Sequence, residues 1–455
     1  MSHFDTTGSA PRRRAAVRPD LGGGRLWRRQ RHHEPHVLPS SSTTTTGGSA
    51  TGIVALLVLL FAILYLDRVC ISVAGPRMQA ELGIDPVGWG WVTGVFTLAY
   101  AMFEIPTGVM GDRIGARLVL ARVVAWWSAF TAFTGAVTGF LPLLAVRFFF
   151  GAGEAGAFPN ASIVVAKWFT AAQRATISGV CLMAGQVGGA LAPLLVLPIQ
   201  QRWGWRASFV IFGGVGLLWV AAWLFYYRDT PDDAPADAVT THGEAGHGSH
   251  TNFPWRQAFR SRTVLGVLVL AFCYIYVYNF FQTWFHTFLV KGRGFGEGAL
   301  FLSALPYVVA TVSNFTGGWT SDRLTKRWGN ARGRRMVGFA SLAVAAASVA
   351  AAYVTRDPYC TLVWLSLCYG AITFQQPGVF GVCLDVGQQC AGAMVGLMNT
   401  SSQTGGFVGS VVYGYIVARA GNYDAPFVPM AIVLAVGSLA WLVVDASKPI
   451  ETVAA

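Results

Sequence analysis

The sequence predicts an all-α membrane protein, with twelve transmembrane helices in two pseudo-symmetric six-helix bundles. Of its 455 residues, 54% are apolar and only 12% are charged, against roughly 25% charged residues in soluble proteins. Apolar stretches of about 20 residues, the length a helix needs to cross the hydrocarbon layer, recur between short polar connections. One long polar segment separates the stretches into two groups, which predicts two bundles.

The predicted spans follow one another closely along the chain. They cover residues 53–75, 89–111, 117–138, 140–164, 174–200, 206–228, 263–290, 297–320, 335–355, 359–383, 393–418 and 425–445. An even number of spans places both termini on one side of the membrane. The connections on that side are richer in arginine and lysine, as at Arg332, Arg334 and Arg335. By the positive-inside rule we therefore expect a multi-pass protein of the cell (inner) membrane with both termini in the cytoplasm.

The segments outside the spans complete the expected domain organisation. We expect a disordered, basic cytoplasmic tail at 1–52, an N-terminal bundle at 53–228, a cytoplasmic linker at 229–262, a C-terminal bundle at 263–445 and a cytoplasmic tail at 446–455. A targeting peptide, or a helix lying on anionic lipid, is the alternative interpretation of the first tail. The basic connections explain much of the net charge of +12, so we expect no nucleic-acid partner.

Two pairs of similar motifs relate the halves. The stretch "GVMGDRIGAR" at 108–117, after the second span, is matched by "GWTSDRLTKR" at 318–327, after the eighth. The stretch "GVCLMAGQVGG" at 179–189 is matched by "GLMNTSSQTGG" at 396–406. Parallel repeats of this kind imply a substrate site near the middle of the membrane, between the halves.

Four charged residues fall inside predicted spans of the N-terminal half: Asp67, Arg68, Arg147 and Glu154. A charge at the centre of a span costs about 2.5–3.5 kcal/mol on insertion scales, so it normally faces a partner or a wet cavity. Arg147 and Glu154 are separated by nearly two helical turns and share one helix face. The functional interpretation is that an arginine binds a substrate carboxylate while the acids exchange protons. The structural alternative is a salt-bridge cluster that joins the first and fourth spans.

The motifs also resemble those of a known family. Gly108, Asp112, Arg113, Gly115 and Arg117 fit the loop signature of the major facilitator superfamily, a transporter fold of twelve helices. The stretches "YLDRVCISVA", "RFFFGAGEAGAFPN", "WGWRASF" and "CLDVGQQCAGAMVGLMNT" are similar to its anion:cation symporter branch, which includes bacterial sugar-acid permeases, sialin and the vesicular glutamate transporters. The resemblance covers nearly the whole chain after residue 52.

The resemblance implies roles for particular residues. In the sugar-acid permeases, the residues that match Asp67 and Glu154 carry protons, and the residue that matches Arg68 holds the anion. The residue that matches Arg147 tunes the glutamate. Tyr100 and Gln186 match positions that line the substrate.

The C-terminal spans hold no charged residue at mid-depth and offer neutral polar side chains instead. We expect Gln282, Asn399 and Gln403 to contact substrate, and Gln403 is the repeat mate of Gln186. Such amides suit a polyhydroxylated acid. Packing between helices through one hydrogen bond is the alternative for each of them.

A second set of charges lies in the repeated loops. Asp112, Arg113, Arg117, Asp322 and Arg323 resemble the clusters that lock the cytoplasmic side of such transporters. Glu104 departs from the family pattern, in which many members have glutamine. We favour a role for Glu104 in this gate, and a further protonatable site is the alternative.

Together these observations predict a secondary transporter that takes up an organic anion, for example an aldonate, aldarate or hexuronate, with protons by alternating access. The sequence does not distinguish protons from sodium as the coupling ion. Exchange of phosphate or phosphorylated compounds and a permease-like ligand sensor are the alternatives. The chain has no HExxH, GxSxG or GxxxxGK motif, so we expect no enzyme. We expect no cofactor and no metal, the lipid bilayer as surroundings, and a monomer.

Overall fold

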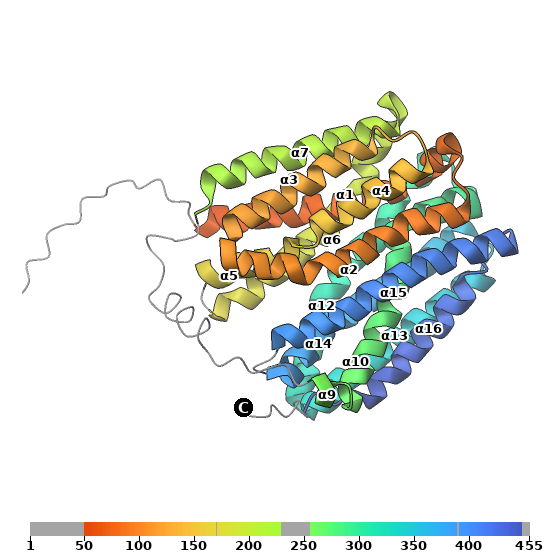
Figure 1. Ribbon diagram of the computed structural model, residues 1–455. Helices are drawn as coiled ribbons and strands as arrows, with labels where there is room; N and C mark the ends of the chain where they lie inside the picture. Colours follow the sequence, from red (N-terminus) through yellow and green to blue (C-terminus); the bar gives the residue numbers. More distant parts are fainter. Residues whose placement is uncertain (1–49, 170, 229–254, 389–390, 448–455) are drawn as a thin grey trace, which may run out of the picture. The chain divides into compact units, whose positions relative to one another are not determined.

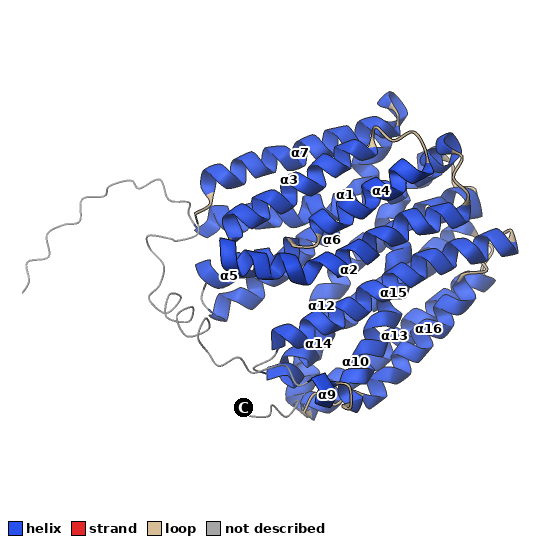
Figure 2. Cartoon of the chain, in the orientation of Figure 1, coloured by secondary structure: helices blue, strands red, loops and turns tan. Residues whose placement is uncertain are grey.

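A computed structural model describes residues 50–169, 171–228, 255–388 and 391–447. Most of the predicted N-terminal tail, linker and C-terminal tail lies outside the described residues. Within them the protein is built from helices and contains no strand (Figure 2). The prediction of an all-helical fold is therefore confirmed.

The helices run back and forth along one common direction (Figure 1). In the first half they are α1 (Ala50–Leu82), α2 (Pro86–Ile114), α3 (Ala116–Thr134), α4 (Phe140–Glu154), α5 (Ala157–Trp168), α6 (Ala171–Trp203) and α7 (Trp205–Tyr226). In the second half they are α9 (Trp255–Ala258), α10 (Arg262–Thr283), α11 (Phe285–Thr287), the π-helical η1 (Phe288–Gly292), the 3-10 helix η2 (Glu297–Ala304), α12 (Leu305–Trp328), α13 (Asn330–Val354), α14 (Pro358–Gly387), α15 (Ala391–Ala420) and α16 (Phe427–Val443). We call the end where α1 begins, on the left in Figure 1, the proximal end, and the opposite end the distal end.

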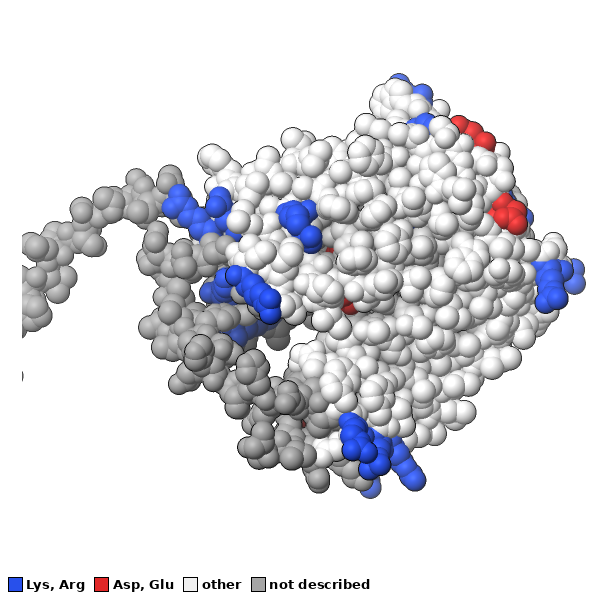
Figure 3. Space-filling view, viewed as in Figure 1, with Lys and Arg blue, Asp and Glu red and all other residues white. Residues whose placement is uncertain are grey.

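Each predicted span overlaps a helix or a series of helices. Nine helices in the described part of the chain are long and apolar enough to cross a membrane, and α16 is a shorter apolar helix. Figure 3 shows a broad face with almost no charged side chains, while Lys and Arg gather towards the ends of the helices. Large apolar side chains such as Leu218 and Phe225 are exposed, as lipid-facing residues would be.

The distal helix starts are defined by local sequence. Asp85 precedes Pro86, and its side chain accepts a hydrogen bond of 2.8 Å from the backbone N–H of Gly88 at the start of α2. Asp357 precedes Pro358 and accepts a bond of 2.7 Å from the N–H of Cys360 at the start of α14. These N–H donors lower the pKa of Asp357. An acidic N-cap followed by proline is a strong start signal, because the carboxylate accepts a free N–H of the first turn and proline has no N–H that needs a partner there.

The fourth predicted span is not one helix. α4 ends at Glu154 and α5 begins at Ala157. Pro159 has no N–H to give to the carbonyl of Ala155, which interrupts the helical ladder. The carbonyl of Gly156 accepts both the backbone N–H of Asn160 at 3.2 Å and its side-chain amide at 2.8 Å. The break places Glu154 at the end of a helix, deep inside the protein.

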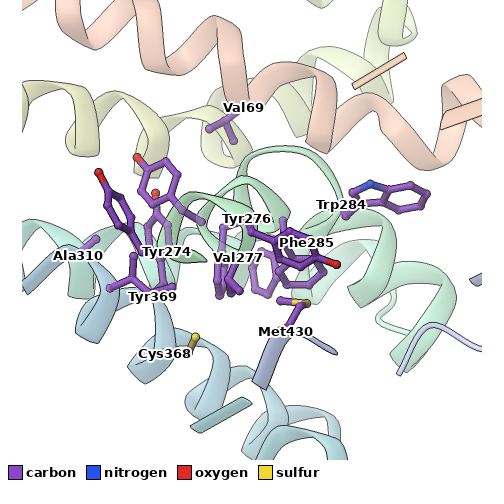
Figure 4. Packing of buried hydrophobic residues seen from close by; sticks show 14 of the residues in the cluster. Val69, Tyr274, Tyr276, Val277, Trp284, Phe285, Ala310, Cys368, Tyr369 and Met430 are labelled. Carbon is purple, nitrogen blue, oxygen red and sulfur yellow. The ribbon is translucent and has the colours of Figure 1, made fainter. Parts of the chain in front are cut away.

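The buried apolar residues form two clusters. One lies in the first half, around α1, α3 and α7. The other joins the distal part of α1 to the second half, and Figure 4 shows Val69 of α1 above Tyr274, Val277 and Tyr369 of that half. The interface between the halves is therefore part of the core.

α2 and α15 approach each other closely across the halves at the distal end. A Cβ on Gly90 would lie 2.8 Å from the carbonyl oxygen of Ser410, and one on Gly94 would lie 3.1 Å from the ring of Phe407. Gly414 lies against the backbone of Pro86. Backbones can approach this closely only where side chains are small. We call this contact the α2–α15 seam.

Candidate functional site

The central feature of the candidate site is a buried ion pair between α1 and α4. Arg68 donates from Nε to Glu154, and the two side chains are 14% and 1% exposed. Neither side chain is saturated, because Nη2 of Arg68 and Oε2 of Glu154 are buried and make no hydrogen bond. The break after α4 brings Glu154 to this position.

Aromatic rings surround Arg68. Its Cζ lies 5.6 Å from the ring centroid of Tyr65, 5.4 Å from that of Phe96 and 5.0 Å from that of Tyr100. Such cation–π contacts stabilise a guanidinium away from water without using its N–H donors. Arg68 can therefore keep N–H donors available for an anion.

Arg147 is buried beside this pair but makes no ion pair among the described side chains. It is 2% exposed, and its Cζ lies 4.8 Å from the ring of Phe96 and 4.6 Å from the ring of Phe150. Its Nε makes no hydrogen bond. Arg147 interacts with Glu154 through its charge, not through a direct bond.

Asp67 is the acid of the four charges that has no hydrogen bond from the described residues to either carboxylate oxygen. It is 2% exposed, and neither carboxylate oxygen meets the geometry of a hydrogen bond, although the indole of Trp127 and the hydroxyl of Thr131 face it. Glu154 and Arg147 interact with it through their charges. A carboxylate buried without hydrogen bonds is costly in its charged form. All four charges expected from the sequence lie in one cluster.

The second half faces this cluster with a layer of hydroxyls and amides. Gln282 donates to the hydroxyls of Tyr278 and Tyr369 at 3.3 and 3.2 Å. Gln186 of α6 donates to the hydroxyl of Tyr278 at 3.5 Å, across the halves. The side-chain oxygens of Gln186 and Gln282 are buried without a partner, so they can accept hydrogen bonds from a substrate hydroxyl.

The two predicted contacts on α15 differ in their surroundings. Asn399 donates to the carboxylate of Glu104 on α2, so it joins the halves directly. Gln403 lies one turn further along α15 and is partly buried. Tyr100, the predicted lining residue on α2, is 2% exposed and lies beside Arg68.

The predicted gate charges lie at the proximal end and do not form a lock in this structure. Arg113, Asp322 and Arg323 are exposed, and none of the three makes an ion pair among the described side chains. Arg117 donates to the carbonyl of Leu224 at the end of α7. The side chain of Asp112 lies outside the described part of the molecule. The gate therefore stays a prediction.

Polar contacts close the distal side between the halves. Gln79 of α1 donates to the hydroxyl of Thr287 at 3.2 Å, and Lys291 donates to the side-chain oxygen of Gln79 at 3.1 Å. Together with the α2–α15 seam, these bonds join the halves distal to Arg68. Among the described residues, Glu104 and Asn399 form the hydrogen bond that joins the halves on the proximal side of Arg68.

Sequence reasoning missed the aromatic residues of the site. Tyr65, Phe96 and Phe150 surround the arginines, and Tyr369 extends the hydroxyl layer. A usable signal existed for Tyr65 and Phe150, because each is three residues from an arginine and so shares its helix face. Phe96 and Tyr369 come from other helices, so no local pattern points to them.

Comparisons with known proteins identify the family of the chain. Residues 57–410 match the family model of the Major Facilitator Superfamily. A probable sulfoacetate transporter of Cupriavidus necator is 34% identical over 402 residues, covering 86% of this chain and 93% of the relative. A hexuronate transporter of Bacillus subtilis is 30% identical over 374 residues, covering 80% and 87%.

A solved structure supports the same fold. A bacterial homologue of the human lysosomal transporter Spinster, in an inward-facing and occupied conformation, aligns with a TM-score of 0.71 at 19% identity, covering 87% of this chain and 96% of the homologue. The family match spans most of the chain and both halves of the fold. The chain therefore belongs to the Major Facilitator Superfamily, and it is an integral membrane transporter, not an enzyme.

Proposed function

We propose that this transporter takes up an organic anion together with protons, by alternating access, across the inner membrane. The observation that carries the proposal is the pair of Arg68 and Glu154, buried between aromatic rings and next to the unbonded Asp67. An arginine in such surroundings fits a carboxylate or sulfonate, because its planar N–H donors match two oxygens at once.

The pair also suggests how anion and proton are coupled. An anion that binds Arg68 competes with the carboxylate of Glu154 for the same guanidinium. A proton on Glu154 weakens its hold on Arg68 and leaves the N–H donors to the anion. Asp67 and Arg147 adjust this exchange through their charges. Protonation and anion binding therefore favour each other, which is the requirement for symport.

The layer of Gln186, Gln282 and Tyr278 supports a hydroxylated substrate, so we propose a sugar acid such as a hexuronate. The similarity to a probable sulfoacetate transporter makes a small sulfonated acid the second candidate. Sulfoacetate has two anionic groups and no hydroxyl. Unlike a hexuronate, it therefore has no hydroxyl to donate to the side-chain oxygens of this layer.

The distal contacts and the exposed gate charges support a state that opens on the proximal side. With more of the basic connections at that end, we propose that the proximal end faces the cytoplasm and that both termini lie there. The opposite state would break the bonds of Gln79 and bring the gate charges together.

The first test is uptake by purified protein in liposomes under an inward proton gradient, with labelled D-glucuronate and labelled sulfoacetate. We expect Arg68→Ala to weaken binding of the transported anion about 10- to 100-fold, because a hydrogen bond to a charged group contributes about 1.5–3 kcal/mol. Arg206→Ala is a matched control, since it removes an exposed arginine–glutamate pair with Glu81 at the distal end.

Three results would contradict the proposal. One is equal binding by wild type and Arg68→Ala, which makes the cluster structural. The second is uptake whose rate does not depend on the proton gradient and increases with a sodium gradient. The third is a rise in the unfolding temperature of the purified protein with cationic or neutral compounds and not with organic anions. Deletion of residues 1–45 tests the sensor alternative, since a transporter keeps its uptake without them.

A further inference from the structure

Glu104 is a charged residue inside a predicted span that the proposed mechanism does not use. It lies one helical turn from Tyr100 on α2 and accepts a hydrogen bond from Asn399 of α15. It is partly buried, while its neighbours Met102 and Ile105 are 57% and 58% exposed on the opposite face of the helix. Glu104 therefore points towards the interface between the halves, not towards lipid.

Among the described residues, one cation, Arg68, interacts with Glu104. Among the described residues, the groups that interact with its carboxylate are Asn399 from α15 and Arg68 from α1, and Tyr100 on its own helix also interacts with it. α3, α4 and α5 also pack against α2, and none of their described charged side chains is among the groups that interact with Glu104. Arg68 is already bonded to Glu154, so Glu104 shares a cation that has another partner.

The charges of the site do not balance when every acid is ionised. Asp67, Glu104 and Glu154 carry three negative charges, against two positive charges on Arg68 and Arg147. An anionic substrate adds a further negative charge to a buried, aromatic-lined space. Uncompensated charge in such surroundings is costly, and acids in this position take up protons. With glutamine at 104 the other four charges sum to zero, whereas ionised Glu104 leaves the empty site at −1. Protons on Asp67 and Glu154 alone neutralise the site with a bound monoanion, and a dianion such as sulfoacetate leaves one negative charge for a third proton.

We propose that Glu104 is a third proton-carrying acid of this site, which deepens the proposed function and rests on it. A proton from water binds the carboxylate of Glu104 when the anion enters, and returns to water when the anion leaves. The protein then takes up one proton more per anion than it would with glutamine at this position.

The bond with Asn399 connects this proton to the movement of the halves. The amide N–H of Asn399 donates to a charged acceptor, and such bonds are roughly twice as strong as neutral ones. Protonation of Glu104 removes the charge and weakens the bond between α2 and α15 on the proximal side. Proton uptake at Glu104 therefore loosens the halves there, and proton loss tightens them.

The test compares wild type with Glu104→Gln, whose side-chain oxygen still accepts from Asn399. Infrared pH-difference spectra of the substrate-free protein report the protonated carboxyl band. We expect part of this band to titrate in wild type and to be missing in Glu104→Gln. Asn399→Ala keeps the acid and loses its donor, so we expect the titrating band to remain in this variant.

The second measurement counts protons taken up on binding of D-glucuronate and of sulfoacetate, by calorimetry in buffers of different ionisation enthalpy. We expect wild type to take up about one proton more per bound anion than Glu104→Gln near neutral pH. An equal count in the two proteins overturns the proposal, and so does an unchanged infrared band. If neither anion binds wild type, the substrate proposal fails, while the substrate-free spectra still decide whether Glu104 titrates.

Discussion

At the scale of single residues, the two buried arginines have the same chemistry and different surroundings. Arg68 is bonded to Glu154 and keeps one N–H group without a partner, whereas Arg147 lies between two aromatic rings and makes no ion pair among the described side chains. Arg68 is therefore placed to exchange partners, and Arg147 is placed to adjust the acids near it through its charge. We therefore expect the substitution of Arg68 and the substitution of Arg147 to have different effects.

Asp67 allows a separate prediction at this scale. Asparagine has nearly the same shape as aspartate, so Asp67→Asn should fold and bind while it can no longer carry a proton. Each coupled proton contributes about 1.4 kcal/mol per pH unit, so steady-state accumulation across a gradient of one pH unit should fall about tenfold. Exchange of labelled for unlabelled anion, which needs no net proton movement, should persist.

The two assays can be run on the same liposomes. Accumulation equal to that of wild type would remove Asp67 from the proton pathway. Loss of exchange as well as accumulation would instead assign Asp67 a structural role, through the first and third helices, because Trp127 and Thr131 of α3 face it.

At the scale of elements, the distal start of α2 depends on its acidic cap. Asp85→Ala removes the acceptor for the N–H of Gly88 and should destabilise the protein by about 1 kcal/mol. Asp85→Asn keeps an acceptor oxygen and should retain most of the stability. Thermal unfolding in detergent checks both, and a loss in the asparagine variant as large as that in the alanine variant would show that charge, not capping, matters there.

Hydropathy was sufficient to predict the membrane-crossing segments, because each span is an independent apolar segment. Pro159 could have predicted the break between α4 and α5. It could not have predicted that the break brings Glu154 to Arg68. The site depends on which helix places Glu154 beside Arg68 and which places Phe96 between Arg68 and Arg147. These are tertiary contacts, and no spacing along the chain encodes them.

At the scale of the whole molecule, polar bonds between described residues join the halves at the distal end, at the central layer and on the proximal side. Gln79 links α1 to both Thr287 and Lys291. Gln79→Leu should remove both bonds and shift the population towards states open at the distal end. The measurement is the labelling rate of a cysteine placed at Ser72, a buried position of α1, by a membrane-impermeant thiol reagent.

The background for this labelling should carry Cys360→Ser, because Cys360 is exposed near the distal end. Asn422→Ala is a matched control, since it removes a polar side chain whose hydrogen bonds to other described residues stay within its own distal loop. Faster labelling in Gln79→Leu than in the control is expected. Equal rates would mean that packing at the α2–α15 seam alone keeps the distal side closed.

The seam itself has a mechanical consequence. Helices that meet through long side chains interlock, and tilting one of them requires many rotamers to change together. Gly90 and Gly414 present backbone to backbone instead, while Gly94 lies against the side chains of Val411 and Phe407. At the two backbone contacts, the crossing angle of α2 and α15 can change with few changes of rotamer. Such a contact acts as a pivot: it keeps the two halves together while it leaves the angle between them free to change.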